Sequence, residues 1–193
     1  MPLDVVVVGP PGAGKGTQAK LIEADRGIPQ IATGDMLRAA IAAGTELGRR
    51  VKEIVDSGEL VPDALMIELI RERLAADGAA GGFVLDGFPR TLAQAEALDE
   101  TLAEVHRALS VVLDFHLAED VAVERLVGRE RNEGRSDDAP EVIRRRLEVF
   151  HAQTEPLLEH YRVRGILVQI HAGRSIGEVQ AEVQQVLEAA SAR

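Results

Sequence analysis

The chain has 193 residues, 46% of them hydrophobic, and a formal net charge of −10. This length suits one domain with small inserted lobes, and the acidic balance argues against a wide nucleic-acid-binding surface. The lack of cysteine excludes disulfides, cysteine-ligated zinc and thiol catalysis. No apolar run reaches membrane-spanning length and the first residues do not resemble a signal peptide, so we expect a cytoplasmic protein that does not bind a membrane.

Strands and helices are expected to alternate along the chain. The β-branched run at 3–8 predicts a strand buried on both faces, followed by a glycine-rich turn at 9–16 and a helix to about residue 25. The alternation predicts a parallel five-stranded sheet covered by helices on both faces. Helical segment 32–61 and the short loop at about 131–137 are expected to form mobile lobes. The remaining strands are expected at 28–31, 83–86, 109–117 and 166–170, and the helices at 34–74 (broken at Gly44, Gly58 and Pro62), 91–103, 119–131, 138–164 and 176–190.

Residues 9–17, Gly-Pro-Pro-Gly-Ala-Gly-Lys-Gly-Thr, match the G-x-x-x-x-G-K pattern of phosphate-binding loops. The glycines let backbone N–H groups converge on phosphate oxygens, the following helix adds partial positive charge, and Lys15 adds a full charge. The alternative is a tight turn with an exposed lysine. Gly16 stands where the general motif has a Ser or Thr that ligates Mg²⁺, which weakens the case for direct ligation by a loop hydroxyl. The candidate ATP-binding residues here are Gly12, Ala13, Gly14, Lys15, Gly16 and Thr17.

Asp86 follows a short apolar run, Phe83-Val84-Leu85, that is expected to be a buried strand. Ligands bind at the carboxyl ends of parallel strands, and a carboxylate there can hold Mg²⁺ through water. An aspartate that caps the next turn is the alternative interpretation, and this residue alone does not decide between them.

Several motifs together resemble the adenylate kinase family. They are the loop at 9–17, Thr33-Gly34-Asp35-Met36-Leu37-Arg38, Gly58-Glu59-Leu60-Val61-Pro62-Asp63, Asp86-Gly87-Phe88-Pro89-Arg90-Thr91 and Gly134-Arg135-Ser136-Asp137-Asp138. The resemblance runs from about Val5 to Val179. It implies a P-loop α/β fold with a helical AMP-binding lobe and a short lid. It also implies a monomer that transfers a phosphoryl group reversibly between Mg-ATP and AMP to give two ADP.

The resemblance also implies roles for individual residues. It places hydrated Mg²⁺ near Asp86, with Asp35 as a second candidate, and directly ligated by no side chain. A short lid without cysteine implies no structural zinc. The implied catalytic residues are Lys15, Asp86, Arg90, Arg125, Arg129, Arg135 and Arg146; Arg129 also serves ATP, and AMP is implied to meet Thr33, Arg38, Leu60, Val61, Gly87, Arg90, Gln94, Arg135 and Arg146.

Some of these roles can be examined from the residues alone. Arg125 and Arg129 lie four apart on one expected helix and so share a face, although neighbouring acids could neutralise them on a solvated surface. Asp138 can act as an N-cap with Pro140 in the first helical turn, which would explain it without catalysis. The five histidines are scattered and are interpreted as structural or exposed.

Three other functions compete with this interpretation. A UMP or CMP kinase would share the fold, and Thr33 and Gln94 are the residues that favour adenine. A GTP-driven switch would need an Asn-Lys-x-Asp motif, which the sequence lacks. A non-catalytic nucleotide sensor would be indicated by a missing arginine, but every matched position holds one. The expected reaction is a direct in-line attack by the AMP phosphate, which needs no strong general base.

Overall fold

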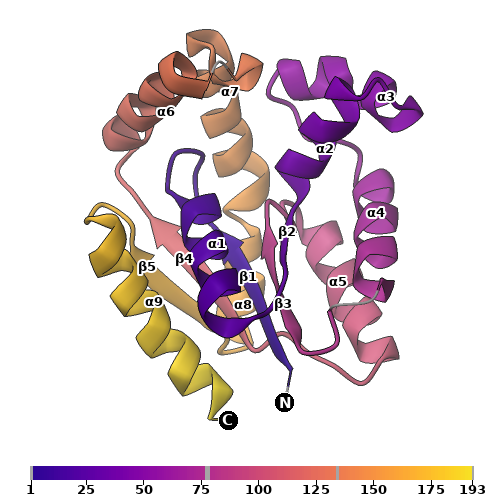
Figure 1. Cartoon of the computed structure of the whole chain (residues 1–193), viewed down its shortest axis with the longest axis vertical. Coiled ribbons are helices and arrows are strands. Elements are labelled where there is room, and N and C mark those ends of the chain that lie inside the picture. The colour runs from indigo at the N-terminus through magenta and orange to yellow at the C-terminus, as the bar shows by residue number, and fades with distance from the viewer. Residues whose placement is uncertain (1, 77–78, 134, 193) are drawn as a thin grey trace.

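The computed structural model describes residues 2–76, 79–133 and 135–192. Its centre is a five-stranded parallel sheet, as the sequence predicts (Figure 1). The strand order is β2-β3-β1-β4-β5. The strands are β1 Leu3–Val8, β2 Gln30–Ala32, β3 Gly82–Asp86, β4 Val111–His116 and β5 Leu167–His171.

Helices precede, connect and follow these strands. α1 to α5 and α9 begin close to where the glycines, prolines and capping residues predict. They are α1 Lys15–Arg26, α2 Thr33–Ala42, α3 Glu46–Asp56, α4 Asp63–Ala75, α5 Leu92–Glu104, α6 Glu119–Glu133, α7 Pro140–Val149, α8 Leu157–Val163 and α9 Ile176–Ser191, with a 3₁₀ turn η1 Ser136–Asp138 and a π-helical turn η2 Phe150–Thr154.

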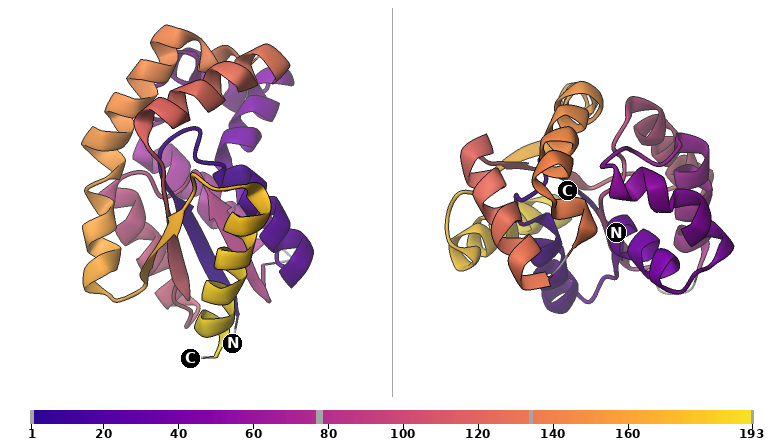
Figure 2. Two further views of the ribbon diagram at one scale, coloured as in Figure 1. Left: turned by 90° about the vertical axis from the view of Figure 1, so that its left-hand side faces the viewer. Right: turned by 90° about the horizontal axis from the view of Figure 1, so that it is seen from above.

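Both faces of the sheet are covered. Side chains along β1 alternate between them: Val5 and Val7 pack with α1 and α9, whereas Val6 and Val8 pack with α4, α5 and α8. Figure 2 shows α1 and α9 on one side of the sheet and the α7–α8 segment on the other. All four valines are almost fully buried, which explains why β1 reads as an unbroken apolar run rather than an alternating one.

The strand register brings two motifs to one edge. Val7 pairs with Asp86 across β1 and β3, so the glycine-rich loop that follows Val8 starts beside the Asp86 carboxylate. Because the strands are parallel, their carboxyl ends meet at the same edge, where ligands of such sheets bind.

Two groups of helices rise beyond this edge. α2 and α3 stand on one side and α6 and α7 on the other, both above the carboxyl ends of the strands (Figure 1; Figure 2, right). α6 and α7 have a small core of their own, formed by Leu126, Ile143 and Leu147. A separate core gives this pair of helices cohesion independent of the sheet.

Two expected elements differ from the structure. The second strand is Gln30–Ala32 rather than 28–31, because Ile28 packs in the core below α1 and the chain pairs with β3 only after Pro29. The single helix expected at 138–164 is instead α7, the turn η2 and α8. Pro156 lacks the N–H that would continue an α-helix, which accounts for the interruption.

The loop expected at about 131–137 is also shorter than predicted. α6 continues to Glu133, and the 3₁₀ turn η1 occupies 136–138, so helical backbone covers most of the segment. Gly134, which belongs to the motif at 134–138, lies outside the described residues.

No helix in the described part of the chain is long and apolar enough to cross a membrane.

Candidate active site

A cavity of about 530 Å³ lies between the carboxyl edge of the sheet and the two groups of helices. All but two of the residues predicted from the sequence line it. They are Gly12, Gly14, Lys15, Gly16, Thr17, Thr33, Arg38, Leu60, Val61, Asp86, Gly87, Arg90, Gln94, Arg129, Arg135 and Arg146.

The loop between β1 and α1 adopts a backbone that requires glycine. Gly12 has φ 86°, and a Cβ there would lie 2.7 Å from the carbonyl oxygen of Ala122, so a larger residue would clash with α6. Lys15 begins α1, and its Nζ donates to the carbonyls of Gly9 and Pro10 at 2.7 and 2.8 Å. The lysine is therefore held against its own loop, at the N-terminus of a helix.

The departure from the general motif at Gly16 has a steric explanation. A Cβ at Gly16 would lie 3.1 Å from Oδ2 of Asp86, closer than most side chains tolerate. Glycine lets the Asp86 carboxylate approach the first turn of α1. The strand-end carboxylate and the phosphate loop are thus in contact, as their register on β3 and β1 requires.

Lys15 has an unusual proton affinity for a lysine. Burial lowers its pKa to about 8; the Asp86 carboxylate opposes this shift, and the charges of Arg90, Arg146 and Arg129 add to it. A full negative charge brought into the cavity would restore the protonated form, so anion binding and protonation of this lysine are coupled.

Two aspartates of the 3₁₀ turn η1 pair with the arginines around the cavity. Asp138 is fully buried and accepts two hydrogen bonds from Arg129, at 2.6 and 2.7 Å, and one from Arg146 at 2.6 Å. Burial alone would raise the pKa of this carboxyl, but the two arginines outweigh it and hold the pKa below its ordinary range. The expectation that Asp138 caps a helix is wrong: the N-cap of α7 is Ala139, and no side chain caps it.

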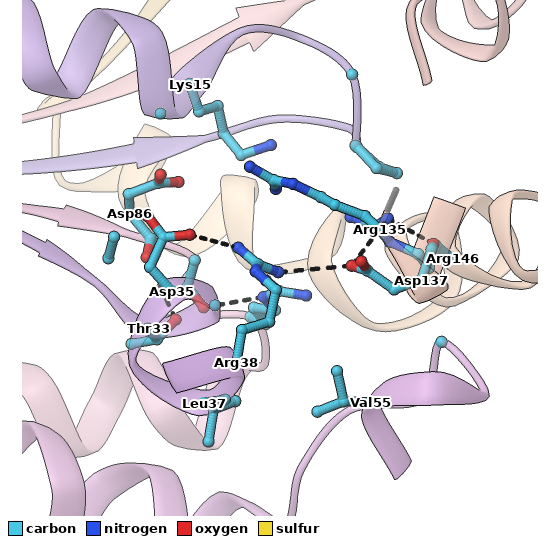
Figure 3. Close-up of a pocket in the computed structure, with 18 of the residues that line it drawn as sticks. Lys15, Thr33, Asp35, Leu37, Arg38, Val55, Asp86, Arg135, Asp137 and Arg146 are labelled. Carbon is cyan, nitrogen blue, oxygen red and sulfur yellow. Dashed lines mark hydrogen bonds and ion pairs between the residues drawn. The ribbon is translucent and has the colours of Figure 1, made fainter. Parts of the chain in front are cut away.

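Asp137 bridges the two groups of helices. Its Oδ2 lies 3.2 Å from Nη1 of Arg146 on α7 and 3.6 Å from Nη1 of Arg38 on α2. Figure 3 shows Arg38 between Asp35 and Asp137, with Lys15 and Arg135 facing the same space. These carboxylates occupy the position where arginines from both sides converge, which is the geometry that a phosphate group would require.

Cations outnumber acids around the cavity. Among the described residues, seven cationic side chains line it against four carboxylates, although the whole chain is acidic. Burial and neighbouring cations lower the pKa of Arg90, and burial lowers that of Arg146, while their acidic neighbours oppose both shifts. The local positive charge therefore favours polyanionic ligands although the net charge of the chain is negative.

The side of the cavity next to α2 has a fixed polar network. Gln94 is 2% exposed; its Oε1 accepts from the backbone N–H of Arg90 at 2.8 Å, and its Nε2 donates to Oδ1 of Asp63 at 2.7 Å. The Thr33 hydroxyl donates to the carbonyl of Asp86 at 3.2 Å. Each of these groups retains capacity for one more hydrogen bond, so a base placed here would meet oriented donors and acceptors.

Two predicted residues do not line the cavity. Arg125 shares a face of α6 with Arg129, but its Nη1 donates to the carbonyl of Ala172 at 3.0 Å, one helical turn away from the phosphate-facing arginines. The side chain of Ala13 packs in the core, and its N–H donates to Pro10. Its place in the loop motif did not reveal that this N–H closes a turn.

The structure adds lining residues that sequence reasoning missed. Lys20 contributes a further cation from α1, and Asp137 contributes a carboxylate. The apolar residues Leu37, Val55 and Met66 form a wall on the side of α2, where Figure 3 shows Leu37 and Val55 below Arg38. Ile176, at the start of α9, is 61% exposed and lines the opposite side. Exposure of an apolar residue beside a cavity is a signal that only the folded chain gives.

A phosphate loop on a central parallel strand, a strand-end carboxylate in contact with it and five arginines around one cavity define a P-loop nucleotide kinase. The family model described as Adenylate kinase matches residues 7–166. The adenylate kinase of Maricaulis maris (strain MCS10) is 50% identical over 186 residues, which cover 96% of this chain and 99% of that protein.

Two further relatives agree. The adenylate kinase of Caulobacter vibrioides (strain NA1000 / CB15N) is 48% identical over 98% of this chain and 100% of its own length. That of Thermobifida fusca (strain YX) is 47% identical over 98% of both chains. The chain belongs to the adenylate kinase family, the enzymes that transfer a phosphoryl group reversibly between ATP and AMP.

Proposed function

We propose that this enzyme binds Mg-ATP at the loop of α1 and AMP beside α2, and that the phosphoryl group passes directly between them. The observation that carries the proposal is the convergence of Lys15, Arg90 and Arg146 on one cavity. These three cations come from α1, the loop after β3 and α7, so a single phosphoryl group between two nucleotides would be surrounded by positive charge.

In the proposed step, an oxygen of the AMP phosphate attacks the γ-phosphorus of ATP. A new oxygen–phosphorus bond forms while the bond from that phosphorus to the β–γ bridging oxygen breaks, and the electron pair leaves with ADP. AMP becomes the second ADP, and no residue is phosphorylated. Because the attacking oxygen is already anionic, alignment and charge neutralisation are the main requirements.

The donor set suits a magnesium ion that arrives with ATP. Among the described residues there is no cluster of three or more His, Cys, Asp or Glu side chains that could hold a metal by itself. Asp86 reaches the first turn of α1, where it would hold the hydrated ion through water, and the ion would neutralise charge on the β- and γ-phosphates.

AMP is favoured over UMP or CMP by the network around Gln94. Its amide orientation is fixed on both sides, by Asp63 and by the backbone of Arg90. A base that offers a donor next to an acceptor would match the remaining capacity of this amide, and the apolar wall of Leu37, Val55 and Met66 suits a large flat ring.

We further propose that the enzyme is a monomer. The large exposed apolar side chains among the described residues are Leu92, Val105, Val163 and Ile176, and they lie at the ends of three different helices rather than in one patch. Light scattering after size exclusion would test this, and a mass of twice 20.8 kDa would contradict it.

The direct step can be tested by stereochemistry. ATP with a γ-thiophosphate made chiral by oxygen isotopes would be converted with AMP, and the configuration of the product read by phosphorus NMR. Single in-line displacement inverts the configuration at phosphorus, whereas a phosphorylated enzyme intermediate retains it. Inversion is expected; retention would rule out the direct step even if AMP is the acceptor.

A further inference from the structure

A second, smaller cavity of about 60 Å³ lies behind Lys15. It shares Lys15, Arg90 and Arg146 with the main cavity, whereas Val8 and Thr154 line only the smaller one. Its volume is enough for a small number of water molecules. No sequence motif pointed to this compartment.

Thr154 ends the π-helical turn η2 and lines this compartment, as does Phe150, the first residue of the turn. Thr154 is 5% exposed, and its hydroxyl forms no hydrogen bond with any residue that the structure describes. Because Thr154 lines this compartment and its hydroxyl has no partner among the described residues, a water molecule in the compartment is the partner available to it.

The π-helical turn accounts for the direction of this side chain. The N–H of Glu155 bonds to the carbonyl of Phe150, five residues back rather than four. On an uninterrupted α-helix, residues eight apart, such as Arg146 and Thr154, differ by roughly 80° around the axis. The wider turn removes part of that rotation, so both residues line the same compartment. Turns of this kind occur frequently at functional sites.

Lys15 has a matching requirement. Its ammonium carries three N–H donors, and only the carbonyls of Gly9 and Pro10 accept from it among the described residues. Arg90 and Arg146, which also line the compartment, supply donors but no acceptor. A water between Thr154 and Lys15 would complete the set of acceptors around the ammonium and give the threonine hydroxyl its partner.

We propose that Thr154 is a positioning residue for phosphoryl transfer, and that its hydroxyl holds Lys15 in place through a water molecule in this compartment. The proposal rests on the function proposed above, since it deepens the role of Lys15 in the same site. Thr154 does not touch substrate; it acts through the water on the lysine.

The test compares Thr154→Val, which removes the hydroxyl at similar size, with Thr154→Ser, which keeps it. For the valine variant we expect kcat to fall about tenfold, through misplacement of the lysine, with KM for AMP within twofold of the wild type. The serine variant should retain most of the activity. Equal losses in both variants, or no loss in the valine variant, would overturn the proposal.

A second readout does not depend on activity. The chain has only three lysines, Lys15, Lys20 and Lys52, so their titration can be followed by carbon NMR of isotope-labelled lysine, with Lys15→Met assigning the signal. Lys15 faces Asp86, Arg90, Arg146 and Arg129, all of which are unchanged in the variants. Loss of an acceptor should lower the pKa of Lys15 by about half a unit in Thr154→Val and leave it unchanged in Thr154→Ser.

The wild-type protein provides the last check. A high-resolution crystal structure is expected to show a water within hydrogen-bond distance of both Thr154 Oγ1 and Lys15 Nζ, and a dry compartment would refute the proposal even if the valine variant fails to fold. If the wild type converts no AMP, the proposed function fails. The titration and the crystal structure would still test whether a water molecule links Thr154 to Lys15.

Discussion

At Lys15, burial and a nearby carboxylate act in opposite directions. Burial favours the neutral amine, Asp86 favours the ammonium, and the result is a pKa of about 8. In the proposed function the ammonium binds phosphate, so ATP would bind to a group that is partly deprotonated just above neutral pH. The pH dependence of binding therefore reports directly on this residue.

We predict that ATP affinity falls as pH rises above about 8. The dissociation constant should increase up to tenfold per pH unit once free Lys15 loses its proton, because the complex must take that proton up again. Calorimetry in buffers of different ionisation enthalpy would measure both the affinity and the proton uptake. Lys15→Met should bind weakly and without this dependence; a constant wild-type affinity from about pH 7 to 9.5 would contradict the assignment.

Asp138 gives a second prediction at this scale. Asp138→Asn leaves Arg129 and Arg146 without their shared carboxylate and should reduce the free energy of unfolding by about 2 kcal/mol. This loss is smaller than the roughly 3–5 kcal/mol expected when a fully buried ion pair is broken, because both arginines keep some solvent access. The low pKa of Asp138 stabilises the fold above the ordinary pKa of aspartate, and this contribution disappears as pH falls below it.

Urea unfolding of the wild type and of Asp138→Asn, at neutral pH and at about pH 3, would show whether the stabilisation by Asp138 decreases in acid. The difference between the two proteins should shrink in acid. A difference that stays constant or grows would show that the charge of the Asp138 carboxylate does not stabilise the fold.

Individual residues were predictable where a motif fixes them. The loop, Asp86 and three of the cavity arginines, Arg38, Arg90 and Arg135, lie in short sequence motifs. Asp138 was not predictable, because an aspartate two residues before a helical proline looks the same whether it caps that helix or pairs with Arg129 nine residues earlier. Arg125 was predicted to reach the site and does not. Helical spacing shows that it shares a face with Arg129, but it does not show whether that face reaches the cavity at Arg125.

The N-termini of two helices, α4 and α5, meet on the proposed AMP side of the cavity. α4 begins at Asp63, and α5 is capped by Thr91, whose hydroxyl donates to the Asp63 carboxylate at 3.0 Å. Gln94, in the first turn of α5, donates to the same carboxylate oxygen. A single carboxylate thus joins two helix starts and orients the amide.

Asp63→Ala is expected to release this amide. KM for AMP should rise about tenfold, since an oriented hydrogen bond to a base is worth on the order of 1 kcal/mol or more, while KM for ATP stays within twofold. Asp63→Asn keeps the oxygen acceptor and is the matched control. If the alanine variant changes both KM values alike, the network supports the fold rather than recognition of AMP. Steady-state kinetics with each substrate varied would decide.

Element types were predictable where hydrophobic period and punctuation agree. Gly44, Gly58 and Pro62 separate α2, α3 and α4, as expected. The interruption at 150–154 was missed because its residues are compatible with an α-helix, and only Pro156 signals a break. The shift of β2 has a similar origin: Ile28 is buried whether or not it pairs in the sheet.

The whole molecule carries its charge unevenly. The chain is acidic, yet arginines from α2, α6, α7 and the loop after β3 surround one cavity. Positive charge is thus concentrated at the cavity although the net charge of the chain is negative. The net charge and the number of arginines can be read from the sequence, but the gathering of arginines around one cavity depends on the fold.

We predict that this arrangement makes substrate capture sensitive to salt. Raising ionic strength from about 0.05 to 0.5 M shortens the screening length and should increase KM for AMP several-fold, with a smaller change in kcat. Neutral osmolytes at matched osmotic pressure serve as the control. A KM that is constant or falls with salt would show that the cavity charge does not attract the substrate.

The central claim is that this cavity transfers a phosphoryl group from ATP to AMP. The most direct test mixes the purified protein with ATP, Mg²⁺ and each of AMP, UMP, CMP and GMP, and follows the diphosphates by phosphorus NMR, with Lys15→Met alongside. Rapid Mg-dependent conversion of AMP, slower or absent with the other monophosphates and lost in Lys15→Met, is the predicted result. Preference for UMP or CMP would contradict the assignment of Thr33 and Gln94 to adenine, and no transfer to any monophosphate would contradict the account as a whole.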